Sequence, residues 1–351
     1  MIYITFISCI LFAAVLTPFV KKLALKIGAT DAPNARKVHK KIMPRLGGLA
    51  IYLAFMIGML ILRPASSYTL PLLTGSTIVV LTGALDDLFS LSAKIKIVAH
   101  FLAALVMVGG GISITFINLP FNGVLYLNWL SVPLTLLWIM GVTNAINLID
   151  GLDGLAAGVS SIVLLTIAGL SLTEGNMFVF AVSAILLGST LGFLPYNFHP
   201  AKIFMGDTGS YFLGYIISVL SLLGFKNVTL FSIVLPMVIL AVPISDTLFA
   251  IVRRWVNKQP LMAPDRSHLH HCLLRYGFTQ AQTVVLMYGM SALFALAAIL
   301  LSSSTLFVSL LIIVGVLVVI ELVVEGVGLI SISYRPLLNA YKRLFSMSKA
   351  K

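Results

Sequence analysis

Long apolar stretches separated by short polar segments run along almost the whole chain. A helix that crosses the hydrocarbon core of a bilayer needs about 20 mostly apolar residues. Eleven stretches close to that length fall at residues 2–20, 47–63, 70–85, 95–114, 131–148, 155–173, 177–194, 209–225, 229–247, 284–303 and 305–323. This pattern predicts an all-α fold, a polytopic membrane helix bundle of about eleven transmembrane helices.

The composition fits a bilayer as the main solvent. Of the 351 residues, 60% are hydrophobic and 10% are charged, whereas a soluble domain carries roughly 25% charged residues. We expect one membrane domain, residues 1–325, followed by a basic cytosolic tail, residues 326–351. Proline, asparagine and glycine cluster at residues 118–123, which predicts a turn or small hairpin between two spans.

The basic residues fall on one side of this predicted bundle. Of the 23 Lys and Arg residues, 21 follow the odd-numbered stretches, and only Arg63 and Lys226 lie in the other connections. Lys and Arg in short loops mark the cytosolic side, so the N-terminus is predicted outside and the C-terminus inside. The net charge of +12 is then explained by the topology, and it would attract the cytosolic face to anionic lipids. No nucleic-acid partner is expected. The predicted cytosolic loops are 21–46, 86–94, 144–154, 195–208 and 248–283.

Most of the acidic residues lie at the cytosolic ends of the apolar stretches. These residues are Asp86, Asp87, Asp150, Asp153, Asp207 and Asp246. A single Asp at such a place is commonly a helix cap. Several carboxylates on one face repel one another unless a cation lies between them, and ionisable groups at membrane depth are functional candidates. Hard oxygen ligands suit Mg²⁺, so the pattern predicts a divalent-metal site.

A histidine-rich loop supplies complementary side chains. It reads Pro-Asp-Arg-Ser-His-Leu-His-His over residues 264–271, and Lys94 and Lys96 follow the first Asp pair. Zinc binding and a plain surface loop are alternatives for the histidines, but imidazole and guanidinium groups also suit phosphate oxygens. Carboxylates, a metal and cations together predict phosphoryl chemistry on a pyrophosphate donor. An ATP-driven pump is disfavoured because no Walker A sequence is present. A CDP-alcohol transferase is disfavoured because Ala157 stands where its motif has Arg.

The motifs resemble those of the polyprenyl-phosphate N-acetylhexosamine-1-phosphate transferases. The matching segments are Asp86-Asp87, Asn-Ala-Ile-Asn-Leu-Ile-Asp-Gly-Leu-Asp-Gly at 144–154, Phe-Met-Gly-Asp-Thr-Gly-Ser at 204–210, His-Leu-His-His at 268–271, and parts of the first loop at 36–39 and 44–48. The resemblance spans about residues 30 to 285, and its specificity comes from the order of the motifs, since each one alone is weak.

The resemblance implies a UDP-N-acetylhexosamine donor, an undecaprenyl phosphate acceptor and release of UMP. It implies a multi-pass protein of the bacterial inner membrane whose active site faces the cytosol. Mg²⁺, or Mn²⁺ in its place, would be held chiefly by Asp207, and Asp86 and Asp87 would be catalytic. Direct displacement and a phospho-enzyme both stay open. The substrate-binding residues expected are Arg45, Lys94, Asn147, Asp150, Asp153, Asn197, Arg266, His268, His270 and His271.

The histidine loop separates two branches of this family. The phospho-MurNAc-pentapeptide branch carries three consecutive histidines and then an aromatic residue, whereas here Leu269 interrupts the run and Cys272 follows it. This resembles the UDP-GlcNAc branch, which starts teichoic acid, O-antigen or related glycans. Transfer of another UDP-sugar is an alternative, and so is a transporter or flippase, which would carry ionisable groups near the centres of its spans. The oligomeric state stays open, with a homodimer as one option.

Overall fold

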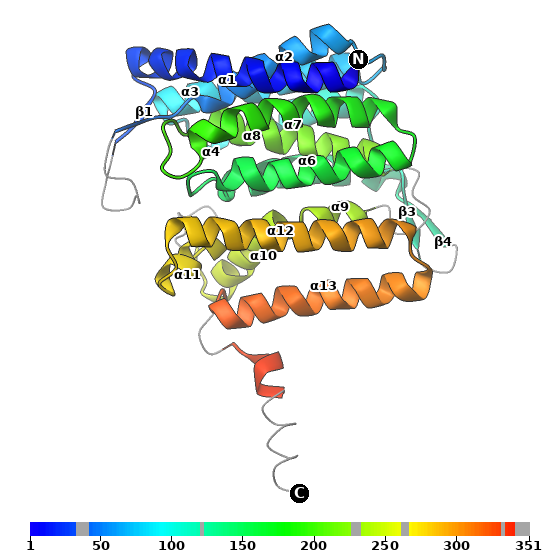
Figure 1. Cartoon of the computed structure of the whole chain (residues 1–351). Coiled ribbons are helices and arrows are strands. Elements are labelled where there is room, and N and C mark those ends of the chain that lie inside the picture. Colours follow the sequence, from blue (N-terminus) through cyan, green and yellow to red (C-terminus); the bar gives the residue numbers. More distant parts are fainter. Residues whose placement is uncertain (33–41, 120–122, 226–232, 261–266, 331–333, 341–351) are drawn as a thin grey trace, which may run out of the picture.

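The protein is mostly helical, with long helices lying side by side and a small hairpin at one end (Figure 1). The computed structural model describes residues 1–32, 42–119, 123–225, 233–260, 267–330 and 334–340. The expected tail, 326–351, falls partly outside these residues.

The long helices coincide with the apolar stretches of the sequence. They are α1 (Ile2–Ile27), α2 (Gly47–Leu62), α3 (Thr69–Phe89), α4 (Ala93–Gly109), α5 (Ser131–Leu148), α6 (Leu155–Thr173), α7 (Met177–Asn197), α8 (Gly206–Gly224), α12 (Gln280–Ser303) and α13 (Leu306–Val327). A 3₁₀ turn, η1 (Asn128–Leu130), precedes α5, and a short helix, α11 (Leu269–Arg275), lies in the histidine loop.

The stretch predicted at 229–247 is not one straight helix. Its described part forms α9 (Val234–Ile239) and α10 (Ala241–Val256), which are separated at Leu240. Pro243 accounts for the break, because its ring clashes with the carbonyl four residues earlier, which belongs to Ile239, the last residue of α9. At its other end, α10 continues to Val256, past the predicted boundary at residue 247.

Seven helices in the described part of the chain are long and apolar enough to cross a membrane. They are α1, α3, the η1–α5 segment Asn128–Leu148, α6, α7, α12 and α13, and α2 is a shorter apolar helix. Helices α6 and α7 lie mostly inside the protein. By contrast, only 22% of the apolar window of α1 and 11% of that of α13 are buried. These two helices therefore present long apolar faces to their surroundings.

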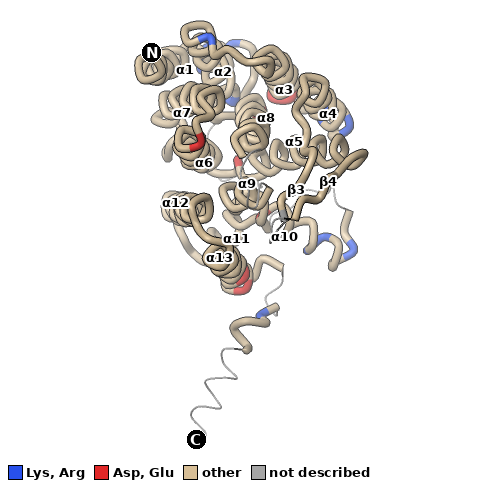
Figure 2. The backbone as a smooth tube through the Cα atoms, turned by 90° about the vertical axis from the view of Figure 1, so that its right-hand side faces the viewer, with Lys and Arg blue, Asp and Glu red and all other residues tan. Residues whose placement is uncertain are grey.

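Helix α8 lies at the centre of the group formed by α1 to α7, as the end-on view shows (Figure 2). It packs against α2, α3, α5, α6 and α7. Close approach depends on glycines: a Cβ on Gly48 would lie 2.0 Å from the Gly209 nitrogen, and one on Gly83 would lie 2.5 Å from the Thr208 Cα. The absence of these Cβ atoms brings the start of α8 against the start of α2 and the last turns of α3.

The first helix packs against partners from a distant part of the sequence. Helix α1 lies along α7 and α2, and Cys9 and Ala13 on this face are fully buried. Several side chains on the opposite face, among them Ile7 and Leu11, are exposed. Helix α1 is therefore held from one side only.

Two short antiparallel ladders lie at opposite ends of the bundle (Figure 1). At one end β1 (Thr30–Asp31) pairs with β2 (Met43–Pro44) and closes the first loop. At the other end β3 (Phe116–Leu119) pairs with β4 (Gly123–Tyr126), which confirms the hairpin predicted at 118–123.

Candidate active site

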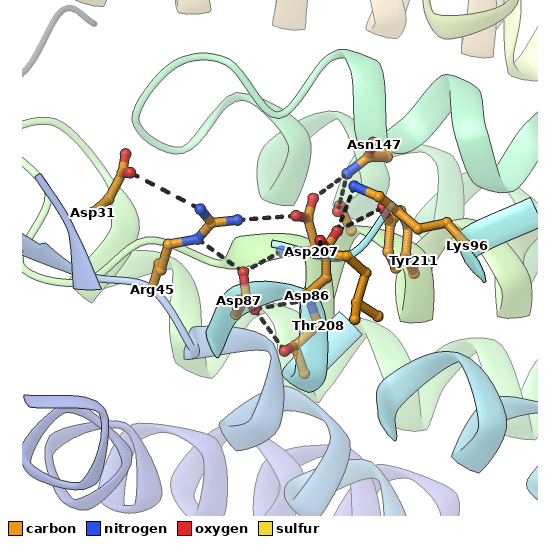
Figure 3. A network of polar contacts seen from close by, with 11 residues as sticks. Asp31, Arg45, Asp86, Asp87, Lys96, Asn147, Asp207, Thr208 and Tyr211 are labelled. Carbon is orange, nitrogen blue, oxygen red and sulfur yellow. Dashed lines mark hydrogen bonds and ion pairs between the residues drawn. The ribbon is translucent and has the colours of Figure 1, made fainter. Parts of the chain in front are cut away.

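Three carboxylates from two helices meet at the β1–β2 end of the bundle (Figure 3). Asp86 and Asp87 belong to the last turn of α3, and Asp207 belongs to the first turn of α8. The predicted convergence of these acidic residues is thus present in the structure, and Arg45 is shared by two of the carboxylates.

Asp87 joins α3 to the first turn of α8. Its Oδ1 accepts the Asp207 N–H at 3.0 Å, and its Oδ2 accepts the Thr208 N–H at 3.1 Å and the Thr208 hydroxyl at 2.7 Å. Arg45 Nε donates to Oδ1 at 2.9 Å. The Asp87 side chain is 0% exposed. Its oxygens are fully engaged, and its negative charge lies where a helix N-terminus favours one.

Asp86 faces the start of α4. Its Oδ1 accepts the Leu91 N–H at 2.7 Å, and its Oδ2 accepts Lys96 Nζ at 2.7 Å and the Tyr211 hydroxyl at 3.2 Å. This side chain is 3% exposed. Asp86 is therefore paired with one fixed cation, and the phenol hydroxyl holds it by a longer bond.

Asp207 is the most accessible of the three carboxylates, with 21% of its side chain exposed. Asn147 Nδ2 donates to its Oδ1 at 2.7 Å, and Arg45 Nη2 donates to its Oδ2 at 2.9 Å. The same Asn147 amide donates to Ser210 Oγ at 2.8 Å. These contacts orient the Asp207 carboxylate and leave part of it open to a ligand.

Arg45 bridges carboxylates from three elements, because its Nη1 also lies 3.9 Å from Asp31 Oδ1. Its backbone is held in place from both sides: the Arg45 N–H donates to the Ala29 carbonyl, and Phe204 N–H donates to the Pro44 carbonyl. The N–H groups of the next two glycines donate to Phe204 and Met205 carbonyls. Two segments recognised separately in the sequence, 44–48 and 204–210, thus form one unit.

The Asp150–Asp153 loop follows α5 beside this cluster. Asp153 Oδ2 lies 2.8 Å from His199 Nδ1 and accepts the Ala201 N–H at 3.1 Å. Asn197 is buried and donates to the Ile203 carbonyl at 3.1 Å. Asp153 and Asn197 both hold the 197–203 loop, so in this structure they position backbone.

The negative charges of the cluster affect the pKa of Asp150. Burial raises the pKa of Asp150, and the nearby carboxylates of Asp207 and Asp87 raise it further, to about 8. The Asp150 carboxyl therefore retains its proton near neutral pH unless a cation arrives nearby.

We expect Asp150→Asn to stabilise the metal-free protein increasingly as pH rises. The unfolded Asp has a pKa of about 3.9 and the folded one a raised pKa. Wild-type stability therefore falls as pH rises between these values, by at most about 1.4 kcal/mol per pH unit. The melting temperatures of the variant and the wild type, measured with EDTA, should diverge from pH 5 to pH 8 and then run parallel. A constant difference across this range would contradict the raised pKa.

The histidine loop lies against the Asp150–Asp153 loop. A Cβ on Gly151 would lie 2.3 Å from His270 Nε2, and the His270 and His271 rings are 4.2 Å apart. Burial lowers the pKa of His270 to about 3, and the adjacent His271 contributes to that shift. His270 is therefore neutral and does not supply a positive charge. His268 pairs with Asp246, and Arg266 lies outside the described residues.

The lysine that contacts the carboxylate cluster is not the predicted one, but a lysine two residues later in the chain. Lys94 is exposed near the start of α4, whereas Lys96 reaches Asp86. Lys96 lies on the same helical face as His100, Ala103 and Met107, which are buried. This 3.6-residue periodicity is the signal that could have identified Lys96. Tyr211 and Thr208 were not predicted as site residues, and Asp246 was noted only among the acidic residues at the ends of the apolar stretches.

The donors at the cluster fit Mg²⁺ only in part. Among the residues that the structure describes, no group of three or more His, Cys, Asp or Glu side chains is arranged to hold a metal ion. Asp207 nevertheless exposes carboxylate oxygen, and Mg²⁺ is commonly bound through one or two carboxylates plus waters and substrate phosphates. The arrangement therefore fits a metal that arrives with a phosphorylated ligand.

Comparison with known proteins places the chain in a family. Residues 69–225, which include Asp86, Asp87, Asn147 and Asp207, match Glycosyl transferase family 4. Over 346 residues the chain is 49% identical to the probable undecaprenyl-phosphate N-acetylglucosaminyl 1-phosphate transferase of Bacillus subtilis (strain 168), covering 98% of this chain and 97% of that protein. The chain belongs to glycosyl transferase family 4.

Relatives of lower identity are similar over most of their length. The decaprenyl-phosphate N-acetylglucosaminephosphotransferase of Mycolicibacterium smegmatis is 35% identical, covering 84% of this chain and 80% of that protein. The undecaprenyl-phosphate alpha-N-acetylglucosaminyl 1-phosphate transferase of Salmonella typhi is 32% identical, covering 82% and 81%. The family expected from the motifs is confirmed.

Proposed function

We propose that this protein transfers N-acetylglucosamine-1-phosphate from UDP-GlcNAc to undecaprenyl phosphate and releases UMP. The reaction would be the first membrane step of a cell-envelope glycan such as teichoic acid. The observation that carries the proposal is the convergence of Asp86, Asp87 and Asp207 with the cations Arg45 and Lys96 at one end of a largely apolar bundle. The 49% identity with the Bacillus subtilis protein supports the choice of sugar and lipid.

The main obstacle to this reaction is electrostatic. Both the acceptor phosphate and the donor pyrophosphate are anions, so their approach must be compensated by positive charge. Arg45 and Lys96 are fixed cations that already lie within 2.9 Å of carboxylate oxygens. Mg²⁺ held at Asp207 would neutralise the pyrophosphate and stabilise the leaving UMP. Asn147 orients Asp207 for that role through its amide.

The two neighbouring aspartates take different parts in this proposal. Asp87 is enclosed by the start of α8 and Arg45, so it acts by positioning Asp207. Asp86 contacts Lys96 and Tyr211, and it is the carboxylate we assign to orienting or deprotonating the acceptor phosphate. Direct displacement and a covalent phospho-enzyme are both compatible with this assignment.

We further propose that the chain crosses the bacterial inner membrane eleven times as a single domain, with α9 and α10 forming one broken span. The N-terminus would lie outside, and the carboxylate end of the bundle would face the cytosol. The support is the predicted positive side of the sequence, which coincides with the end that carries β1, β2 and α11 (Figure 1). The long apolar faces of α1 and α13 would contact lipid.

The decisive experiment is UMP release by purified protein in detergent, with undecaprenyl phosphate, Mg²⁺ and either UDP-GlcNAc or UDP-MurNAc-pentapeptide. We expect UMP only with UDP-GlcNAc, and at least a 100-fold loss on adding EDTA, which Mg²⁺ or Mn²⁺ restores. UMP from the pentapeptide donor alone would move the protein to the other branch. No UMP from either donor by folded protein would favour another UDP-sugar or a transport function.

A further inference from the structure

A buried acidic residue outside the carboxylate cluster is directed at the histidine loop. Asp246 lies on α10 and is only 2% exposed. Its Oδ1 accepts the Leu269 N–H at 2.7 Å, and its Oδ2 lies 2.9 Å from His268 Nδ1. The two carboxylate oxygens therefore contact His268, the residue just before α11, and Leu269, the first residue of α11.

The helix that carries Asp246 is itself firmly held. Asp246 lies on the buried face of α10, together with Ala250 and Arg253. Arg253 Nη1 donates to the Leu329 carbonyl just after α13. This contact holds the C-terminal end of α10. Asp246 is therefore held in one orientation relative to α11.

This contact determines the protonation pattern of the His268 ring. A carboxylate that accepts a backbone N–H and has no proton of its own is only an acceptor. The His268 nitrogen facing it must then carry the proton, so the neutral ring has N–H at Nδ1 and a lone pair at Nε2. His268 is 5% exposed, so rotation of the ring is also restricted. With Nδ1 committed to Asp246, Nε2 is the ring atom left to a ligand.

The His268 ring also belongs to a layer that reaches the Asp150–Asp153 loop. It is parallel to the His270 ring within 5°, with ring centroids 6.1 Å apart, and His270 lies against Gly151. Fixing His268 thus fixes a ring that is stacked on His270. His270 in turn contacts the loop that lies beside Asp207 and Asp87.

We propose that Asp246 is a positioning residue for the transfer reaction. It holds His268 with its proton on Nδ1, so that Nε2 accepts a hydrogen bond from a hydroxyl of the UDP-sugar donor. This inference rests on the proposed function, since it assigns the donor as the ligand of His268. The carboxylate does not touch the donor itself; its effect passes through the imidazole.

Replacing Asp246 by Asn tests the proposal with little change in volume. The Asn amide presents an N–H₂ group to one of its two former donors, so it cannot satisfy both His268 Nδ1–H and the Leu269 N–H. We expect Asp246→Asn to lower kcat/KM for UDP-GlcNAc by about 10- to 100-fold, the loss typical when the hydrogen-bond partner that orients a functional histidine is changed. His268→Gln should cause a loss of similar size.

The double variant separates positioning from folding. If Asp246 acts through His268, Asp246→Asn together with His268→Gln should be no slower than the worse single variant. Ser245→Ala, one residue away on α10, is the control and should keep wild-type kinetics and melting temperature. UDP-GlcNAc binding to each variant, measured by calorimetry, should weaken in parallel with kcat/KM.

Two results would overturn the proposal. One is multiplication of the two single losses in the double variant, which would mean that Asp246 acts apart from His268. The other is folded Asp246→Asn protein with unchanged kinetics. Failure of the proposed function looks different, because wild-type protein itself would then release no UMP from UDP-GlcNAc and would not bind this donor.

Discussion

Asp207→Asn is expected to abolish UMP release almost completely while leaving the protein folded. Asp207 is the most exposed carboxylate of the cluster, and the proposed metal depends on its charge. Loss of a metal anchor and of transition-state charge compensation should lower kcat by about 1,000-fold. The melting temperature should hold or rise, because one of several neighbouring negative charges is removed. UMP release and thermal unfolding, measured on the same preparation, check both parts.

The matched control for Asp207→Asn is Glu174→Gln, which removes an acidic charge at the opposite end of α6 from the cluster. This variant should keep wild-type turnover. Mn²⁺ binding, followed by electron paramagnetic resonance with UDP-GlcNAc present, gives a readout apart from turnover and should weaken only in Asp207→Asn. Turnover within tenfold of wild type in folded Asp207→Asn protein would refute the role of Asp207.

Asp87→Ala is expected to lose both activity and stability. Its carboxylate accepts three hydrogen bonds from Asp207 and Thr208, and it pairs with the Arg45 guanidinium. Removing one partner of a buried pair commonly costs about 3–5 kcal/mol. We therefore expect a clear fall in melting temperature and at least a 1,000-fold loss of turnover, since the first turn of α8 carries Asp207.

Asp87→Asn distinguishes the two contributions to this effect. Asn keeps the size of Asp and its single acceptor oxygen can still take the Thr208 N–H and hydroxyl, but its N–H₂ group cannot accept the Asp207 N–H. Part of the stability should therefore return while turnover stays low. Recovery of turnover along with stability would show that Asp87 serves only as a structural brace. An unchanged melting temperature in Asp87→Ala would contradict the contacts that join α3 to α8.

The helices could be predicted because their physical cause is local. Apolar runs near span length form helices in a bilayer, where every backbone polar group must be satisfied within the segment. The broken span was missed because Pro243 lies within an apolar window, and hydropathy carries no information on the carbonyl that a proline ring displaces. The hairpin was found from its turn residues alone.

The sequence identified most residues of the site, but it did not predict how they are arranged. Asp86, Asp87, Asn147, Asp207 and Arg45 were identified by motif, and the structure brings them together. Their different burial could not be read from the sequence, because it depends on how α8 packs against α3. Lys96 and Asp246 lie on buried helical faces, which periodicity could have indicated. The Asp246–His268 pairing joins two separate segments and required the structure.

The pairing of α1 with α7 has a consequence for biosynthesis. About 150 residues separate the end of α1 from the start of α7, which corresponds to roughly 8–30 s at ribosomal rates of about 5–20 residues per second. During that interval α1 has no α7 surface to bury Cys9 and Ala13. It can pack only against α2, and the surface that later meets α7 stays in the lipid, where the helix is supported by its own backbone hydrogen bonds. The chain therefore enters the membrane in sequence order, but the bundle can close only after its middle helices have left the ribosome.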